Sequence, residues 1–362
     1  MLKKFLSLLV VLTVMASATP SHAFLQKGIM FAGAGVPSIP ANVSAPVVSG
    51  AVIVGQTLNC STGGWTGNPF PTYTYKWRKN AVDISGATSS SWVVDSANVA
   101  GPIDCVVTAT NSQGSTSQDS ADLTTFTPNT IGTVLAWYDP SDTASITDAG
   151  GGAVSQINDK SGNGYHATQG TAGRRPITGT QTINSLNALD FDGVVGGTTA
   201  DTLVLPSGVY TVSSGNNTVF VIAKTDVSTS GNHFMLYNSN SGSGFYQLAM
   251  GGSNTTLNYS SSNAYNFSTS TISGDTNVHV WGGIRNGTSM RSFYDGVLGP
   301  DNTSASNTTT TAAFIGADNF GGQTWDGKVG EIVIFTKALS TQEMNWMGAY
   351  LAYKWGFTWT TM

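Results

Sequence analysis

The chain has 362 residues, a length that favours two domains, and only 10% of its residues are charged. Gly, Ser, Thr and Asn take the place of charge, a composition that suits turns and the exposed faces of strands. Once the two N-terminal lysines are set aside, thirteen basic residues face twenty acidic ones, a net charge near −7 that argues against nucleic-acid binding, because such binding needs a basic surface.

Residues 1–23 are typical of a secretory signal peptide. Lys3 and Lys4 precede an apolar run over residues 5–15, and Ser21 and Ala23 offer the small residues of a cleavage site. The apolar run is short for a bilayer span, although a retained membrane anchor is the alternative. No later segment is long and apolar enough to span a membrane. We therefore expect a secreted or cell-surface (extracellular) protein with no membrane span in the mature chain.

Residues 24–45 lack periodicity and are expected to form a flexible lead-in, and residues 46–125 to form a first domain. Short strand-like segments alternate there with Gly and Asn turns, as in residues 72–78, which alternate with period two. Several short strands at this spacing predict a β-sandwich.

The first domain contains Cys60, Trp77 and Cys105 in that order. With VGQTL (54–58), YKWR (75–78), ISGAT (84–88) and VTATN (107–111), this region resembles the immunoglobulin-like modules of bacterial and phage surface proteins. The resemblance implies a Cys60–Cys105 disulfide between the sheets. Export makes a disulfide reasonable, and two buried free thiols are the alternative. A spacer role is expected for this module, with partner binding as the alternative.

Residues 126–131 are expected to be a linker and residues 132–362 a second domain. The apolar run 219–223 predicts a strand that is covered on both faces, and Asp295-Gly296 predicts a hairpin turn. Ser340 and Glu343 have the spacing of a helix capping box. The helix that follows carries one apolar stripe, which is expected to pack against the sandwich: Met344, Met347, Leu351 and Trp355.

Six short motifs occur in order along the second domain. They are LAWYDPSD (135–142), NDKSGNGYHA (158–167), ALDFDG (188–193), FYDG (293–296), GKVGEI (327–332) and ALSTQE (338–343). Together they resemble the laminin G-like domains of the concanavalin A-like lectin/glucanase superfamily. The resemblance implies a two-sheet jelly roll. The expected fold class is all-β: an N-terminal immunoglobulin-like sandwich and a C-terminal concanavalin A-like jelly roll with one C-terminal α-helix.

Catalytic residues are poorly represented. Glycosidases on this fold generally use a close pair of carboxylic acids, but Glu331 and Glu343 are the only glutamates. Glu331 stands among apolar neighbours and Glu343 belongs to the helix cap. No histidine accompanies a nucleophile-elbow pattern, and no zinc-ligand spacing occurs. We predict that the protein is not an enzyme, with a glycan-cleaving hydrolase that uses an Asp pair as the alternative.

Calcium is the cofactor that the sequence brings into consideration, because laminin G-like domains often carry it at the sandwich rim. Asp159 and Asn163 lie at alternate positions of a turn, and Asp190 and Asp192 share one face of a strand while Phe191 takes the other. These oxygens suit Ca²⁺. The alternative is that Asp159 and Asn163 satisfy turn backbone amides and that the other two are solvated.

Aromatic residues within Asn/Ser/Gly segments form the candidate ligand site: Tyr237, Tyr246, Tyr259 and Trp325. Rings stack on the C–H faces of sugars while amides read hydroxyls, and the same composition suits protein-binding loops. Alternatively, these segments only cap the sandwich, and Trp325 is a core residue. The predicted function is non-catalytic binding of a carbohydrate or cell-surface protein ligand. The alternatives are a structural or adhesion component of a cell surface or phage virion, and a hydrolase.

Overall fold

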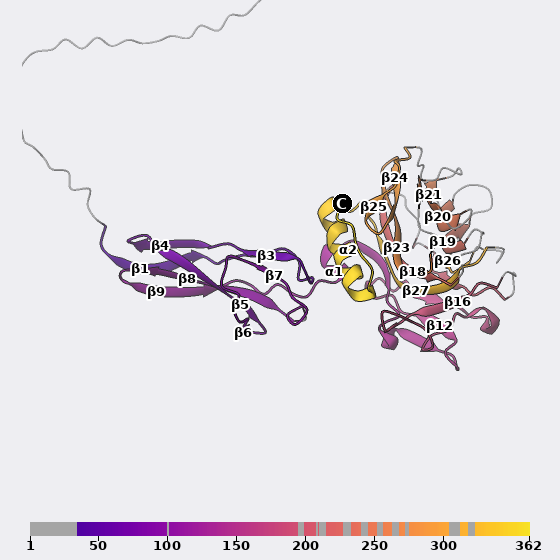
Figure 1. The fold of residues 1–362 in the computed structure, drawn as a ribbon, viewed down its shortest axis with the longest axis horizontal. Helices are drawn as coiled ribbons and strands as arrows, with labels where there is room; N and C mark the ends of the chain where they lie inside the picture. Colours follow the sequence, from indigo (N-terminus) through magenta and orange to yellow (C-terminus); the bar gives the residue numbers. More distant parts are fainter. Residues whose placement is uncertain are drawn as a thin grey trace, which may run out of the picture.

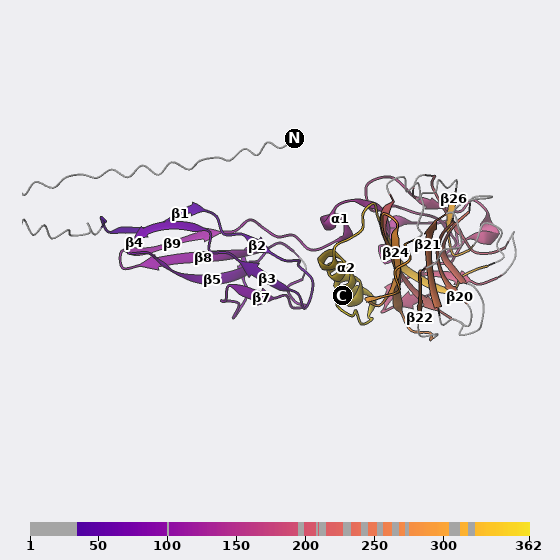
Figure 2. The same cartoon turned by 90° about the horizontal axis from the view of Figure 1, so that it is seen from above.

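The protein consists of two β-rich domains joined end to end, as a computed structural model shows (Figure 1). Figure 2 gives the same arrangement from above, with helix α2 (Thr341–Trp355) at the junction in both views. No helix in the described part of the chain is long and apolar enough to cross a membrane. The structure describes residues 35–99, 101–194, 199–207, 209, 215–226, 233–239, 245–251, 256–262, 268–271, 275–303, 312–317 and 323–362.

The first domain is a β-sandwich. A three-stranded sheet (β2-β3-β7) and a four-stranded sheet (β6-β5-β8-β9) enclose a core around Leu58 and Trp77, and β1 and β4 form a separate pair. The Cys60–Cys105 disulfide joins β3 to β8, as predicted. The strands are β1 (Ser38–Ser44), β2 (Val48–Ser49), β3 (Thr57–Cys60), β4 (Gly64–Asn68), β5 (Thr72–Lys79), β6 (Val82–Asp83), β7 (Ser91–Val93), β8 (Ile103–Asn111) and β9 (Gly114–Asp119).

Two segments differ from the expected outline. Strand β1 lies within the expected flexible lead-in, where Pro40 weakens the sequence signal. It pairs with β4 as an edge strand, a position where proline is tolerated. The expected linker contains a short helix, α1 (Pro128–Ile131). Residues 1–34, with the predicted signal peptide, lie outside the described residues.

The second domain has two large antiparallel sheets and a small hairpin, β14 (Thr182–Ile183) with β15 (Leu186–Asn187). The seven-stranded sheet contains β10 (Val134–Tyr138), β16 (Leu189–Asp192), β18 (Asn216–Thr225), β23 (His279–Asn286), β24 (Ser289–Tyr294), β25 (Val297–Leu298) and β27 (Asp326–Phe335). The nine-stranded sheet contains β11 (Ile146–Asp148), β12 (Val154–Ile157), β13 (Ala167–Thr168), β17 (Leu203–Leu205), β19 (His233–Ser239), β20 (Phe245–Gly251), β21 (Thr256–Ser262), β22 (Ser268–Thr271) and β26 (Ala312–Ile315).

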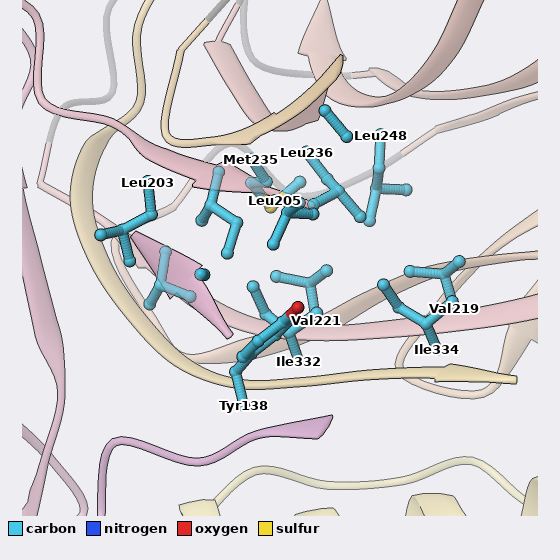
Figure 3. Close-up of a cluster of buried hydrophobic side chains, with 14 of the residues drawn as sticks. Tyr138, Leu203, Leu205, Val219, Val221, Met235, Leu236, Leu248, Ile332 and Ile334 are labelled. Atoms are coloured by element: carbon cyan, nitrogen blue, oxygen red, sulfur yellow. The ribbon is translucent and has the colours of Figure 1, made fainter. Parts of the chain in front are cut away.

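The main core lies between these two sheets. Figure 3 shows Val219 and Val221 of β18 beside Ile332 and Ile334 of β27, facing a second layer that includes Leu203. Alternate residues of β18 point the other way and pack under α2. The apolar run 219–223 is therefore covered on both faces, as predicted.

Helix α2 (Thr341–Trp355) covers the outer face of the seven-stranded sheet. Ser340 and Glu343 form the predicted capping box, and Gly356 ends the helix in the left-handed conformation. The predicted apolar stripe is buried: Met344, Met347, Leu351 and Trp355. The all-β class with one long C-terminal helix is thus confirmed.

Candidate functional site

Glu331, one of the two glutamates, is completely buried in β27, with 0% of its surface exposed. Its Oε1 accepts hydrogen bonds from the Trp137 indole at 2.6 Å and the Tyr350 hydroxyl at 3.1 Å. Its Oε2 accepts hydrogen bonds from Lys354 Nζ and the Trp355 indole, both at 2.8 Å. Both oxygens are therefore held by donors of the protein itself.

The charges around Glu331 continue into a network that joins α2 to the sandwich. Lys354 Nζ also lies 2.8 Å from Asp139, and Lys160 lies 3.1 Å from Asp139 and 2.8 Å from Asp142. Burial raises the pKa of Glu331, and Lys354 opposes that rise. Burial acts on Asp139 in the same sense, but Lys354 and other donors outweigh it and its pKa is lowered. The network therefore fixes α2 to the sandwich through buried ion pairs.

Asp159 organises a turn. Its carboxylate accepts hydrogen bonds from the backbone N–H groups of Trp137 (2.9 Å), Ser161 (2.8 Å) and Tyr165 (3.0 Å), and from the Ser161 hydroxyl (2.7 Å). The Asn163 amide donates to the carbonyls of residues 134 and 135. Carboxylate oxygens already occupied by N–H donors do not suit a cation. These two residues therefore do not fit the expected calcium site and have the alternative role, satisfying turn backbone groups.

Asp190 and Asp192 lie on β16 beside the start of β27. They pair across the strands with Lys328 and Asp326, while Phe191 is buried in the core, so the expected alternation of faces is present. Lys328 Nζ lies 3.9 Å from Asp190 Oδ1 and donates to Asp226 at 2.6 Å. Carboxylates thus gather around one ammonium group at one end of the sandwich.

This acidic rim also includes Asp201, whose Oδ2 accepts a hydrogen bond from the backbone N–H of Asp192 at 3.2 Å. Burial, and next the Asp192 carboxylate, raise the pKa of Asp201 to about 7. Over the described residues, no three Asp, Glu, His or Cys side chains converge in an arrangement that holds a metal ion. Calcium binding by Asp190 and Asp192 stays a prediction.

The candidate ligand residues do not form one described site. Tyr237, Tyr246 and Tyr259 lie on the neighbouring strands β19, β20 and β21, and their side chains lie outside the described part. Trp325 is 0% exposed and packs edge-on against Trp281, with ring centroids 6.3 Å apart. For Trp325 the alternative is correct: it is a core residue, a member of the hydrophobic cluster between the two sheets.

A groove that the sequence did not predict lies along α2. One wall is a partly buried face of the helix, where Gln342, Asn345, Trp346 and Ala349 recur at helical spacing. Trp346 is only partly buried, so part of its ring remains open to a ligand. We call this feature the α2 groove.

The opposite wall is the C-terminal tail, residues 357–362, which folds back over α2. The Trp359 ring covers Gly348, where an added Cβ would lie 2.0 Å from a ring atom. Asn345 Oδ1 accepts hydrogen bonds from the Trp359 indole at 3.0 Å and from the Met362 backbone N–H at 2.9 Å. Thr360 N–H donates to the Asp295 carbonyl at 2.8 Å. The tail is therefore fixed at both the helix and the β24–β25 turn.

The α2 groove offers polar groups as well as rings. Its volume is about 750 Å³, within the range of roughly 300–1,000 Å³ that is usual for small-ligand sites. Asn345 is hydrogen-bonded to the tail, but five other lining side chains with a hydroxyl or amide make no hydrogen bond within the described part. No charged side chain is found among the described lining residues. The five polar residues are Gln56, Thr341, Gln342, Thr358 and Thr361.

Sequence reasoning missed this groove because its walls come from three separate segments. The one available signal was the aromatic pair Phe357 and Trp359 after Gly356, which ends the helix. Two aromatic side chains in a short polar tail indicate that the tail packs against another part of the protein.

Comparison with known proteins agrees with the fold. Residues 196–345 match the family Laminin_G_3, described as the concanavalin A-like lectin/glucanases superfamily. No curated protein sequence shows significant similarity to the chain.

Several solved structures are similar at low identity. Domain 4 of AbnA, a GH43 extracellular arabinanase from Geobacillus stearothermophilus, in complex with arabinotriose, is 16% identical, with a TM-score of 0.44 over 60% of this chain and 98% of that chain. The binding domain of botulinum neurotoxin DC in complex with rat synaptotagmin II is 12% identical (TM-score 0.45; 62% of this chain, 55% of that chain). The Trypanosoma rangeli sialidase in complex with sialic acid is 13% identical (TM-score 0.45; 70% of this chain). This chain spans 43% of the sialidase.

Proposed function

We propose that the protein is an exported, non-catalytic binding protein whose C-terminal domain recognises a carbohydrate. The observation that carries this proposal is the α2 groove, where partly open aromatic rings lie beside amides and hydroxyls that have no partner within the described part. Aromatic faces suit the C–H faces of a sugar, and free amides suit its hydroxyls. The family match over residues 196–345 is consistent with a lectin-like role.

The environment of Glu331 supports a role without catalysis. Retaining glycoside cleavage needs two carboxyl groups about 5 Å apart on either side of the scissile bond. Glu331 is enclosed in the core by four hydrogen-bond donors, and Glu343 accepts hydrogen bonds from the Ser340 backbone and Lys337 in the helix cap. Neither glutamate faces the α2 groove.

The Cys60–Cys105 disulfide supports export, because disulfides form and persist in oxidising compartments. Together with the signal-like first 23 residues, it favours an extracellular location. Mass spectrometry of the protein recovered from the culture medium tests this: we expect an N-terminus near residue 24 and a mass that corresponds to one disulfide.

A glycan array probed with residues 24–362 tests the function. We expect binding to at least one glycan, in buffers with calcium and with EDTA, because no Asp or Glu is among the described residues that line the α2 groove. A parallel incubation with each bound glycan, followed by chromatography, should show no shortened product. Binding to no glycan would overturn the carbohydrate proposal, and released sugar would overturn the non-catalytic one.

A structural or adhesion role is the second candidate, and one surface favours it. Val36, Ile39 and Phe70 are 86%, 58% and 72% exposed. They lie in or next to β1 and β4, at the end of the first domain far from α2 (Figure 1). Exposed apolar side chains at one end of a module suit a protein contact. This candidate would be favoured if no glycan on the array bound the protein and if the protein captured a purified surface protein in a pull-down.

A further inference from the structure

The first domain is packed against the second rather than merely tethered to it. Ala51, Ile53 and Phe126 are 5%, 2% and 5% exposed and belong to the same core cluster as Leu351 and Trp355 of α2. The Phe126 ring lies 5.7 Å from the Tyr350 ring on α2. These shared apolar contacts limit the motion of one domain relative to the other.

The connection between the domains is also short and bonded. Thr125 forms a parallel β-bridge with Val52, and helix α1 begins at Pro128, two residues after Phe126. Figures 1 and 2 agree that α2 and α1 lie at the junction. The segment that leaves the first domain is therefore fixed to the same loop, residues 51–53, that packs on α2.

That loop leads directly to Gln56, which lines the α2 groove together with the residues of the helix and the tail. Its backbone is fixed within the first domain, because its N–H donates to the Ile53 carbonyl at 3.0 Å and its carbonyl accepts from Val94 N–H at 2.9 Å. Its side-chain amide makes no hydrogen bond in the described structure. The amide therefore stands at the groove with both its donor and its acceptor free.

We infer that the two domains form one binding unit: Gln56 of the first domain completes the α2 groove, and the ligand is an uncharged saccharide that contacts both Gln56 and Trp346. The absence of charged side chains from the described lining disfavours acidic and basic ligands, since a bound charge would lose its hydration without a counter-charge. The first domain is then part of the site, and not only a spacer. This inference rests on the proposed function and adds the position of the binding site and the class of ligand.

Isothermal titration tests the inference with cellohexaose, maltohexaose, xylohexaose and mannohexaose as neutral probes, and with sialyllactose and oligogalacturonate as charged ones. We expect the wild-type chain to bind a neutral probe and neither charged one. Trp346→Ala should abolish that binding, and Gln56→Ala should weaken it about 3- to 10-fold, the range expected for losing a hydrogen bond or two. Gln113→Ala is the matched control, because Gln113 is an exposed glutamine at the β8–β9 turn of the same domain.

Ile53→Asp tests the role of the interface separately. An aspartate against α2 should separate the domains, which small-angle X-ray scattering would detect as a larger radius of gyration. It should also lower the affinity for the neutral probe at least as much as Gln56→Ala does. If Trp346→Ala abolishes binding while Gln56→Ala and Ile53→Asp leave it unchanged, the two-domain site is wrong and the proposed function stands. If the charged probes bind or Trp346→Ala has no effect, the assignment of ligand and groove is wrong. If no neutral probe binds, the inference is overturned, and the glycan array decides separately whether the proposed function stands.

Discussion

Replacing Glu331 by glutamine should destabilise the second domain without affecting ligand binding. The change keeps the side-chain volume, so it opens no cavity, but it exchanges one carboxylate oxygen for an NH₂ group. The less costly orientation places the amide oxygen toward Lys354 and Trp355. The NH₂ group then faces the Trp137 indole, which can only donate, and the Tyr350 hydroxyl, which can rotate to accept.

The expected cost follows from these contacts. One buried indole N–H without an acceptor costs about 1–3 kcal/mol. Removing one partner of a buried ion pair costs about 3–5 kcal/mol, but Lys354 keeps Asp139 as a partner and the loss should fall at the lower end. Together these two costs come to about 4–6 kcal/mol, which for a domain of this size lowers the melting temperature by about 8–24 °C.

Urea unfolding followed by tryptophan fluorescence measures the effect, because Trp137 and Trp355 both contact Glu331. Glu343→Gln is the matched control. A glutamine can take the same place in the capping box, and the Lys337 pair is partly exposed, so we expect less than about 1 kcal/mol.

Two results would refute the reasoning. A cost below about 1 kcal/mol for Glu331→Gln would mean that the carboxylate does not hold the network. A variant that is as stable as the wild type but has lost a glycan-cleaving activity would assign Glu331 to catalysis and overturn the proposed function.

Three further predictions concern other parts of the molecule. Cys60→Ser with Cys105→Ser, which opens a link between residues separated by 45 positions, should cost about 4 kcal/mol in urea unfolding of the first domain. The pKa of Asp201 is raised from 3.8 to about 7, so its contribution to stability is present below pH 3.8 and is lost as the pH rises through 7. Asp201→Asn should therefore make the free energy of unfolding depend less on pH and should be more stable than the wild type at pH 8. An unchanged dependence of stability on pH would contradict this prediction. Gly348→Ala should gain about 1 kcal/mol of helix propensity yet lower the melting temperature, because the new methyl group displaces Trp359; a higher melting temperature would show that the tail does not lie there.

Local features of the fold could be read from the sequence because the residues that decide them lie close together. Ser340, Glu343 and Gly356 mark the ends of α2, and the apolar stripe from Met344 to Trp355 fixes the face that packs. The Cys60–Cys105 pairing followed from a resemblance and is present. The run 219–223 predicted two covered faces but did not identify α2 as the cover.

The candidate site needed the tertiary structure. The sequence alone determined an all-β chain with an amphipathic C-terminal helix, because hydrophobic period and cap spacing are local properties. Only the folded chain decided that Trp325 belongs to the core, that Asp159 is already hydrogen-bonded by its turn, and that a groove joins Gln56 to Trp346. A side chain's chemistry depends on which distant groups surround it, and the periodicity of a segment records how it folds but not which segments it meets.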